Sequence, residues 1–191
     1  LFRSAIVDDV KLILFEDCVK RRALHEPLQY IIGMWDFYKY SFKVGKGVLI
    51  PRPETEILVD FAVDKIRQNE YKIVFDLCCG SGCIGLSVAK MCPQVKVYCV
   101  DISDDALEYT RKNKELLCCD NVTVVKADIL EGTSFIGLPR PDIILSNPPY
   151  IRSSEIPSLQ KEVHFEPKLA LDGGDDGLVF YRQLSEIWYP L

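Results

Sequence analysis

Residues 76–82 form the first segment whose residue types could bind a ligand. The segment follows a short apolar run, contains Gly80 and Gly82, and is followed directly by a helical pattern. Glycines at a strand-to-helix turn let the backbone approach a ligand closely, and the amides at the helix N-terminus can hold an anionic group. The segment therefore predicts a ligand-binding loop. A tight turn without a ligand is the alternative. A dinucleotide-binding fold is the rival, and we set it aside on the interpretation that Ile84 and Gly85 after Gly82 do not form its fingerprint.

Carboxylates follow the next two apolar runs along the chain. Asp101 ends the run that starts at Val95, and Asp128 and Ile129 follow the run over residues 122–126. In nucleotide-binding α/β domains, an acidic side chain at the end of the second strand accepts hydrogen bonds from the two hydroxyls of a ribose. The glycine loop and Asp101 together therefore predict a nucleoside ligand.

The tetrapeptide Asn147-Pro148-Pro149-Tyr150 follows a fourth apolar run. In open α/β sheets, ligands bind beyond the carboxyl ends of the strands, where this tetrapeptide would lie. The Asn147 side-chain carbonyl and the Pro148 backbone carbonyl can each accept one N–H of a planar amide or exocyclic amine, on which Tyr150 can stack. Orienting such a weakly nucleophilic nitrogen, without a strong base, suits methyl transfer from a sulfonium. A Pro-rich turn without chemistry is the alternative.

These segments lie in a regular alternation of strand and helix patterns. Strands that alternate with helices imply a parallel sheet with helices on both faces, so the fold class is α/β, doubly wound from about Tyr71 onward. Because such a sheet demands another strand after a crossover helix, we expect it to be truncated after its fourth strand and the helix that follows. The predicted strands are 73–77, 95–100, 122–126 and 142–145, and the predicted helices are 54–66, 82–91, 104–117 and 177–188.

The residues before this domain follow different patterns. Apolar residues recur at helical spacing over residues 2–24, which predicts one helix that cannot bury its apolar face alone. Residues 35–50 are rich in aromatic and β-branched residues and are broken by Gly45 and Gly47, which predicts a β-hairpin. The predicted organisation is a remnant of a helical substrate-binding domain at 1–33, a hairpin linker at 34–53 and a catalytic α/β domain at 54–191.

The composition restricts the partners and the compartment. Acidic residues outnumber basic ones by 28 to 23, a net charge of −5, which disfavours a site built on nucleic-acid phosphates. The eight cysteines form no CxxC pair and lie mostly inside apolar runs, so we expect reduced, buried thiols and no metal. No apolar stretch reaches the roughly 20 residues of a membrane span. The expected partners are proteins or small molecules, with no direct nucleic-acid binding and no membrane.

Several motifs resemble one known family. Residues 76–82 and the tetrapeptide at 147–150 look like those of the S-adenosylmethionine-dependent methyltransferases that modify planar nitrogens. Further motifs are similar to those of a narrower group, the HemK/PrmC-type release-factor glutamine methyltransferases. The segments that carry this narrower resemblance are residues 26–33, 49–56, 165–167 and 170–174.

The resemblance implies a Rossmann-like class I methyltransferase sheet that takes its methyl group from S-adenosylmethionine and leaves S-adenosylhomocysteine. The implied substrate is the glutamine side-chain amide nitrogen in the Gly-Gly-Gln loop of peptide-chain release factors. The implied cofactor-binding residues are Cys78, Cys79, Gly80, Ser81, Gly82, Asp101, Asp128, Ile129 and Asn147. The implied catalytic residues are Asn147, Pro148 and Tyr150, and the implied substrate-binding residues are these three with Pro149, Arg52 and Glu54. The strict family loop has glycine in place of Cys78, a difference that fits if this residue keeps a negative φ.

Other functions stay open on the sequence alone. A ribosomal-protein glutamine methyltransferase is one, and a nucleic-acid amino-methyltransferase acting on adenine or guanine is another, although the acidic charge disfavours it. A third is a fragment that binds cofactor or partner without turnover, because the predicted sheet is incomplete. We expect a monomer that resides in the cytoplasm, or in mitochondria if the source is eukaryotic.

Overall fold

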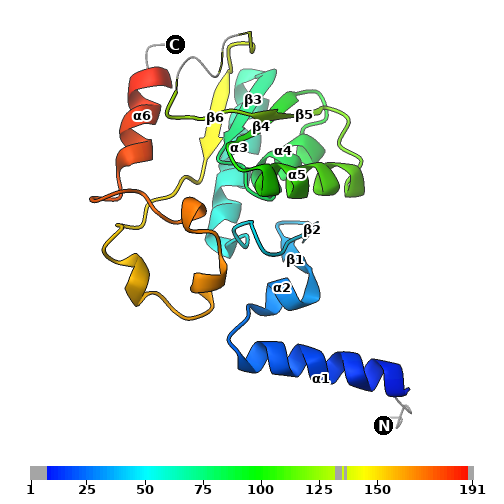
Figure 1. The fold of residues 1–191 in the computed structure, drawn as a ribbon. Coiled ribbons are helices and arrows are strands. Elements are labelled where there is room, and N and C mark those ends of the chain that lie inside the picture. The colour runs from blue at the N-terminus through cyan, green and yellow to red at the C-terminus, as the bar shows by residue number, and fades with distance from the viewer. Residues whose placement is uncertain (1–7, 132–134, 136, 189–191) are drawn as a thin grey trace.

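The computed structural model describes residues 8–131, 135 and 137–188, and its body is one parallel sheet flanked by helices (Figure 1). The strands are β3 (Ile73–Leu77), β4 (Lys96–Asp101), β5 (Val122–Lys126) and β6 (Ile143–Ser146), in the order β5-β4-β3-β6. All three pairings are parallel, so the four carboxyl ends meet at one edge. The predicted α/β sheet is confirmed, and each predicted strand differs from the observed one by at most one residue at either end.

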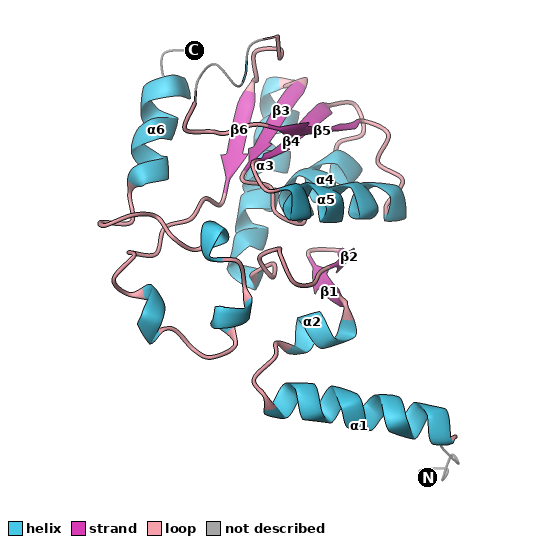
Figure 2. Cartoon of the chain, viewed as in Figure 1, coloured by secondary structure: helices cyan, strands magenta, loops and turns pink. Residues whose placement is uncertain are grey.

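Helices cover both faces of this sheet, as predicted. They are α3 (Glu56–Asn69), α4 (Cys83–Met91), α5 (Asp104–Leu116) and α6 (Val179–Trp188). Because side chains alternate along a strand, Val74 packs with the core residues of α3, α4 and α5, whereas Phe75 packs in a second core that Phe180 of α6 contacts. Figure 2 shows α6 alone on its side of the sheet, with α4 and α5 on the other.

The N-terminal helix lies apart from the body (Figure 1). This helix, α1 (Asp9–Ala23), begins at Asp8, whose carboxylate accepts a hydrogen bond from the Lys11 amide at 2.8 Å. It buries none of its residues. The predicted helix is thus confirmed over most of its length, while residues 2–7 of that prediction lie outside the described residues.

A short helix and a hairpin connect α1 to the body, namely α2 (Leu28–Ile32), β1 (Met34–Phe37) and β2 (Tyr40–Lys43). The hairpin turns at Tyr38 and Lys39, so the prediction of a break at Gly45 and Gly47 is wrong. Tyr38 takes a φ of 57° and donates its amide to the Glu56 side chain at 2.8 Å. A tertiary contact therefore stabilises a turn that carries no glycine signal.

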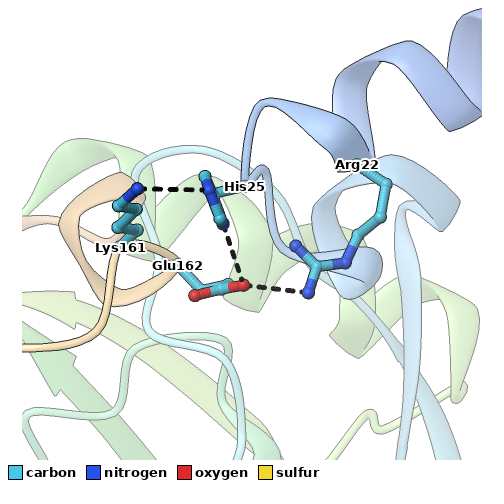
Figure 3. A network of polar contacts seen from close by, with 4 residues as sticks. All are labelled: Arg22, His25, Lys161 and Glu162. Carbon is cyan, nitrogen blue, oxygen red and sulfur yellow. Dashed lines mark hydrogen bonds and ion pairs between the residues drawn. The ribbon is translucent and has the colours of Figure 1, made fainter.

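A polar network joins the end of α1 to a loop that follows β6 (Figure 3). The Glu162 carboxylate accepts a hydrogen bond from Arg22 at 2.8 Å and lies 3.5 Å from His25 Nδ1. Lys161 Nζ lies 3.5 Å from the other ring nitrogen of His25. Exposed contacts of this kind contribute about 0–1 kcal/mol each, so the network orients the N-terminal segment more than it stabilises it.

Two substitutions on helix α4 test how closely it packs against the sheet beneath the site. A Cβ added at Gly85 would lie 2.6 Å from Cys99 Sγ, so we expect Gly85→Ala to destabilise the protein by about 1–3 kcal/mol. The buried hydroxyl of Ser87 on the same helix has no partner in the described part of the chain, so Ser87→Ala should be neutral or stabilising. Thermal unfolding of both variants measures this. Equal losses of stability in the two variants would contradict the close packing at Gly85.

Candidate active site

A cleft opens at the carboxyl edge of the sheet and encloses about 900 Å³, open solvent at its mouth included. The predicted site residues that line the cleft are Arg52, Cys78, Cys79, Gly80, Ser81, Asp101, Asp128, Ile129, Asn147 and Pro149. The predicted residues that do not line it are Glu54, Gly82, Pro148 and Tyr150.

The carboxylate of Asp101 holds the glycine loop at the end of β4. One oxygen accepts a hydrogen bond from the Gly80 amide at 2.9 Å, and the other accepts one from the Ser103 amide at 3.0 Å. Burial raises the pKa of Asp101, and these amides act against that rise. Each carboxylate oxygen keeps a second lone pair, so Asp101 can accept further hydrogen bonds from a ligand in the cleft.

Helix α5 holds the carbonyl groups of the same loop. Thr110 donates its hydroxyl to the Gly80 carbonyl at 2.8 Å, and the fully buried Asn113 donates to the Ser81 carbonyl at 2.9 Å. These residues are three apart, so they share one face of the helix. The loop is therefore fixed at amides by Asp101 and at carbonyls by α5, which leaves it preorganised for a ligand.

Cys78 takes a positive φ of 58°, so the expectation that it keeps a negative φ is wrong. The strand ends here and the chain turns into the loop, where Gly80 and Gly82 also have positive φ. A Cβ in this region costs about 1–2 kcal/mol, which explains why glycine is the favoured residue at such a position. Cys78 still lines the cleft.

The thiols around the loop are unreactive. Burial raises the pKa of Cys78 and Cys79 and raises the pKa of Cys83 to about 12. A protonated thiol is a poor nucleophile and a poor metal ligand. In the described part of the chain, no three side chains of metal-binding type come together. These cysteines therefore shape the cleft rather than carry chemistry.

Asn147 and Ser81 are polar residues of the cleft whose side chains have no hydrogen-bond partner among the described residues. Pro148 and Pro149 are buried and fix the backbone around Asn147. Tyr150 is 56% exposed and does not line the cleft, although its neighbour Pro149 does. A free amide on a fixed backbone can accept and donate hydrogen bonds to a planar group.

Two glycines set the backbone of Tyr150. A Cβ at Gly173 would lie 2.8 Å from the Tyr150 Cα, and one at Gly177 would collide with the Tyr150 carbonyl. Ile151 also forms an isolated parallel bridge with Asp172. The glycine-rich segment after residue 171 is therefore a close-packed support for the tetrapeptide.

Glu166 joins two segments that lie far apart in sequence. Its side chain is 2% exposed and accepts hydrogen bonds from the Ile50 amide at 2.9 Å and from the Arg52 guanidinium. The segments on either side of this contact line the cleft through Leu49, Pro51, Arg52 and Thr55 and through Pro167, Leu169 and Ala170. Arg52 thus lies at the cleft as predicted, but its charge is directed to Glu166.

The sequence interpretation missed the roles of several buried groups. Glu166 belongs to a segment that carried the resemblance, yet no role followed from it. Asp76 is fully buried, with one oxygen bonded to the Gly85 amide at 2.8 Å and the other without a partner in the described residues. The sequence pattern did not indicate that Thr110 and Asn113 hold the glycine loop, because residues three apart on one helix face are also common where a helix simply packs against the core.

Known proteins share this combination of elements. The family model of the methyltransferase small domain matches residues 54–183, and that of the PrmC N-terminal domain matches residues 1–33. A release factor glutamine methyltransferase of Clostridium acetobutylicum is 44% identical over 187 residues, 97% of this chain and 65% of that protein. One of Thermodesulfovibrio yellowstonii is 43% identical over 171 residues, 88% of this chain and 60% of that protein. The chain therefore spans less than two thirds of the length of each.

The parallel sheet, the glycine loop and the cleft at the carboxyl edge define a Rossmann-like class I methyltransferase fold. Gly85 completes a GxGxxG spacing with Gly80 and Gly82, so the interpretation that set a dinucleotide-binding fold aside on the loop alone is wrong. The family match excludes that fold instead. The chain belongs to the methyltransferase small domain family and is of the HemK/PrmC type. No described helix is both long and apolar enough to cross a membrane.

The buried carboxyl of Asp76 makes the stability of the protein depend on pH. Burial raises its folded-state pKa to about 7, above the unfolded value of about 4. Between these values the folded protein holds a proton that the unfolded chain has released, so stability falls as the pH rises through this window. We expect Asp76→Asn to remove up to about 4 kcal/mol of that fall, measured by urea unfolding at several pH values. The exposed Asp120→Asn is the control, and parallel pH profiles for Asp76→Asn and wild type would contradict the assignment.

Cys78 generates a second prediction. Cys78→Gly and Cys78→Ala both remove the thiol, but only alanine keeps a Cβ at a φ of 58°. We expect the glycine variant to be more stable by about 1 kcal/mol, despite the greater freedom of glycine in the unfolded chain. Chemical denaturation of the two variants measures the difference. A more stable alanine variant would show that this backbone carries no strain.

Proposed function

We propose that this chain is the methyl-transferring part of an S-adenosylmethionine-dependent protein glutamine methyltransferase whose substrates are peptide-chain release factors. The observation that carries the proposal is the free side-chain amide of Asn147, at the cleft that also contains the Asp101 carboxylate and the fixed glycine loop. The names of the relatives support the substrate.

The residues around the cleft suit S-adenosylmethionine. Asp101 supplies acceptors for ribose hydroxyls, and the loop from Gly80 to Ser81 supplies backbone groups for the methionine part. Apolar side chains beside Asp128, including Ile129 and Ile102, suit the faces of an adenine ring. The bound cofactor would supply a methyl group on a positively charged sulfur, an electrophile strong enough for a weakly nucleophilic nitrogen.

The tetrapeptide would orient the substrate amide. The Asn147 side-chain carbonyl and the Pro148 backbone carbonyl would each accept one of its two N–H groups, and Tyr150 at the rim would stack on its plane. Held in this way, the nitrogen would face the methyl group that the cofactor supplies, and the amide proton released on transfer would pass to solvent. Most of the rate would come from orientation, since no strong base is required.

The remaining residues would position the substrate protein. We assign residues 1–33 to the remnant of a helical substrate-binding domain, residues 34–53 to a hairpin linker and residues 54–191 to the catalytic domain. Glu54 lies in a short 3-10 helix between Arg52 and Thr55, which line the cleft, and we propose it as a contact for the substrate backbone.

Label transfer distinguishes the candidate functions. The chain would be incubated with methyl-labelled S-adenosylmethionine and a release factor, its Gln→Ala variant in the Gly-Gly-Gln loop, ribosomal proteins, or DNA and RNA. Label on the release factor and none on the Gln→Ala variant is the expected result. Equal label on both proteins, or label on ribosomal protein or nucleic acid alone, would contradict the proposal.

Asn147→Ala separates orientation from binding. We expect it to lower kcat by more than about tenfold, a loss above about 1.4 kcal/mol, while the affinity for S-adenosylhomocysteine falls only modestly. The exposed Asn69→Ala on α3 is the control for a general effect of losing an asparagine. If Asn147→Ala retained more than a tenth of the wild-type kcat, Asn147 would have no orienting role.

A further inference from the structure

A second hollow lies beside the cofactor cleft, and five of the residues that line it are charged. Its walls come from the end of α1 with α2, from the hairpin and the turn after it, and from α5, and we call it the basic groove. Gly45 and Lys46 line the basic groove, whereas the next two residues, Gly47 and Val48, line the cofactor cleft. The two sites therefore share one wall. The charged residues that line the groove are Arg21, Glu26, Lys43, Lys46 and Lys112.

The charges in the basic groove are unbalanced. Four cations and one carboxylate line it, although the whole chain carries a net charge of −5. Arg21 is neutralised by Glu26, to which it donates two hydrogen bonds, and the exposed Lys112 pairs with Glu108 on its own helix. Lys43 and Lys46 have no ion pair within the described residues. These two ammonium groups are free to meet an anion.

The scaffold that carries Lys43 is rigid. The fully buried Asn113 accepts a hydrogen bond from the Lys43 amide at 2.7 Å and donates one to the Lys43 carbonyl at 3.0 Å. The same side chain bonds the Ser81 carbonyl of the cofactor loop. A bound anion would therefore have little backbone to order, which favours binding.

Gly45 leaves room for the Tyr109 hydroxyl in the lining of the basic groove. A Cβ added at Gly45 would collide with the Tyr109 hydroxyl, which has no hydrogen-bond partner among the described residues. Tyr109 lines the same groove as Lys43 and Lys46, and its phenolic O–H is a further donor for a carboxylate. Gly45 therefore has a role that its sequence signal, taken as a hairpin break, did not indicate.

The surroundings of the groove restrict the length of the anion. Asp105 is exposed on α5, and a Cβ at Gly47 would touch it, whereas Asp104 and Glu108 on the same helix pair with Lys126 and Lys112. A nucleic-acid backbone that continued past the lysines would meet the Asp105 carboxylate, and like charges at close range are unfavourable. A short segment with a few carboxylates fits the charge pattern better than a long polyanion.

We propose that the basic groove binds a short acidic segment of the protein substrate, as a second contact besides the glutamine in the cofactor cleft. The identity of that partner rests on the proposed function, whereas the affinity for acidic peptides does not. Binding there would hold the substrate protein next to the wall formed by residues 45–48, and so beside the cleft that contains Asn147.

The test uses charge reversal on the 191-residue chain. Lys43→Glu with Lys46→Glu reverses the groove, and Lys65→Glu with Lys96→Glu, on α3 and at the opposite end of β4, makes the same charge change elsewhere. Fluorescence anisotropy with labelled octaglutamate at low salt should show saturable binding by wild type and control, and roughly tenfold weaker binding by the groove variant. No saturable binding by wild type, or equal binding by all three proteins, would overturn the proposal.

Kinetics connect the groove to the substrate. We expect the groove variant to raise KM for a release factor by roughly tenfold, with kcat and cofactor affinity unchanged and no effect on a short peptide that contains only the Gly-Gly-Gln loop. An unchanged KM for the release factor overturns the proposal. If the groove variant with an unchanged KM had also lost affinity for RNA, the groove would be a nucleic-acid site instead. Octaglutamate binding without any label transfer to release factors would contradict the proposed function while supporting the groove.

Discussion

The arrangement of the site depends on one carboxylate at the end of one strand. Asp101 accepts hydrogen bonds from the amides of Gly80 and Ser103, and so ties the glycine loop after β3 to the loop after β4. A parallel sheet brings these strand ends to one edge but does not by itself fix the loops that follow. Without this carboxylate, the amide of Gly80 would lose its partner, and the link between the glycine loop and β4 would rest on the hydrogen bond from the Cys79 amide to the Val100 carbonyl at 3.0 Å.

Other elements extend this constraint around the cleft. Thr110 and Asn113 hold the carbonyl groups of the loop from α5, and Asn113 also holds the hairpin through Lys43. On the far side, Glu166 joins two segments 116 residues apart through the Ile50 amide. The cleft is thus enclosed by buried hydrogen bonds, and Asn147 is left free at its edge. Buried polar networks are favourable only when satisfied, so this enclosure is specific to one arrangement of the chain.

Local patterns were sufficient to predict most of the body. Strands β3 and β5 have the predicted bounds because short apolar runs between polar turns have few other interpretations, and the parallel order brings Gly80, Asp101 and Asn147 to one cleft. The turn at Tyr38 was not predictable, because a distant carboxylate on Glu56 stabilises it. The positive φ of Cys78 and the contact of Glu166 with Arg52 depend on tertiary packing. Composition and residue spacing carry no information about such packing, so neither feature could be predicted from them.

The central claim is that Asp101 both fixes the glycine loop and faces the cofactor. Calorimetric titration of S-adenosylhomocysteine into wild type and Asp101→Asn tests it directly, because asparagine keeps the shape but loses the charge and one acceptor. The account predicts an affinity loss of about tenfold or more, since hydrogen bonds to a charged group contribute about 1.5–3 kcal/mol. An unchanged affinity in a variant that remains folded would contradict it.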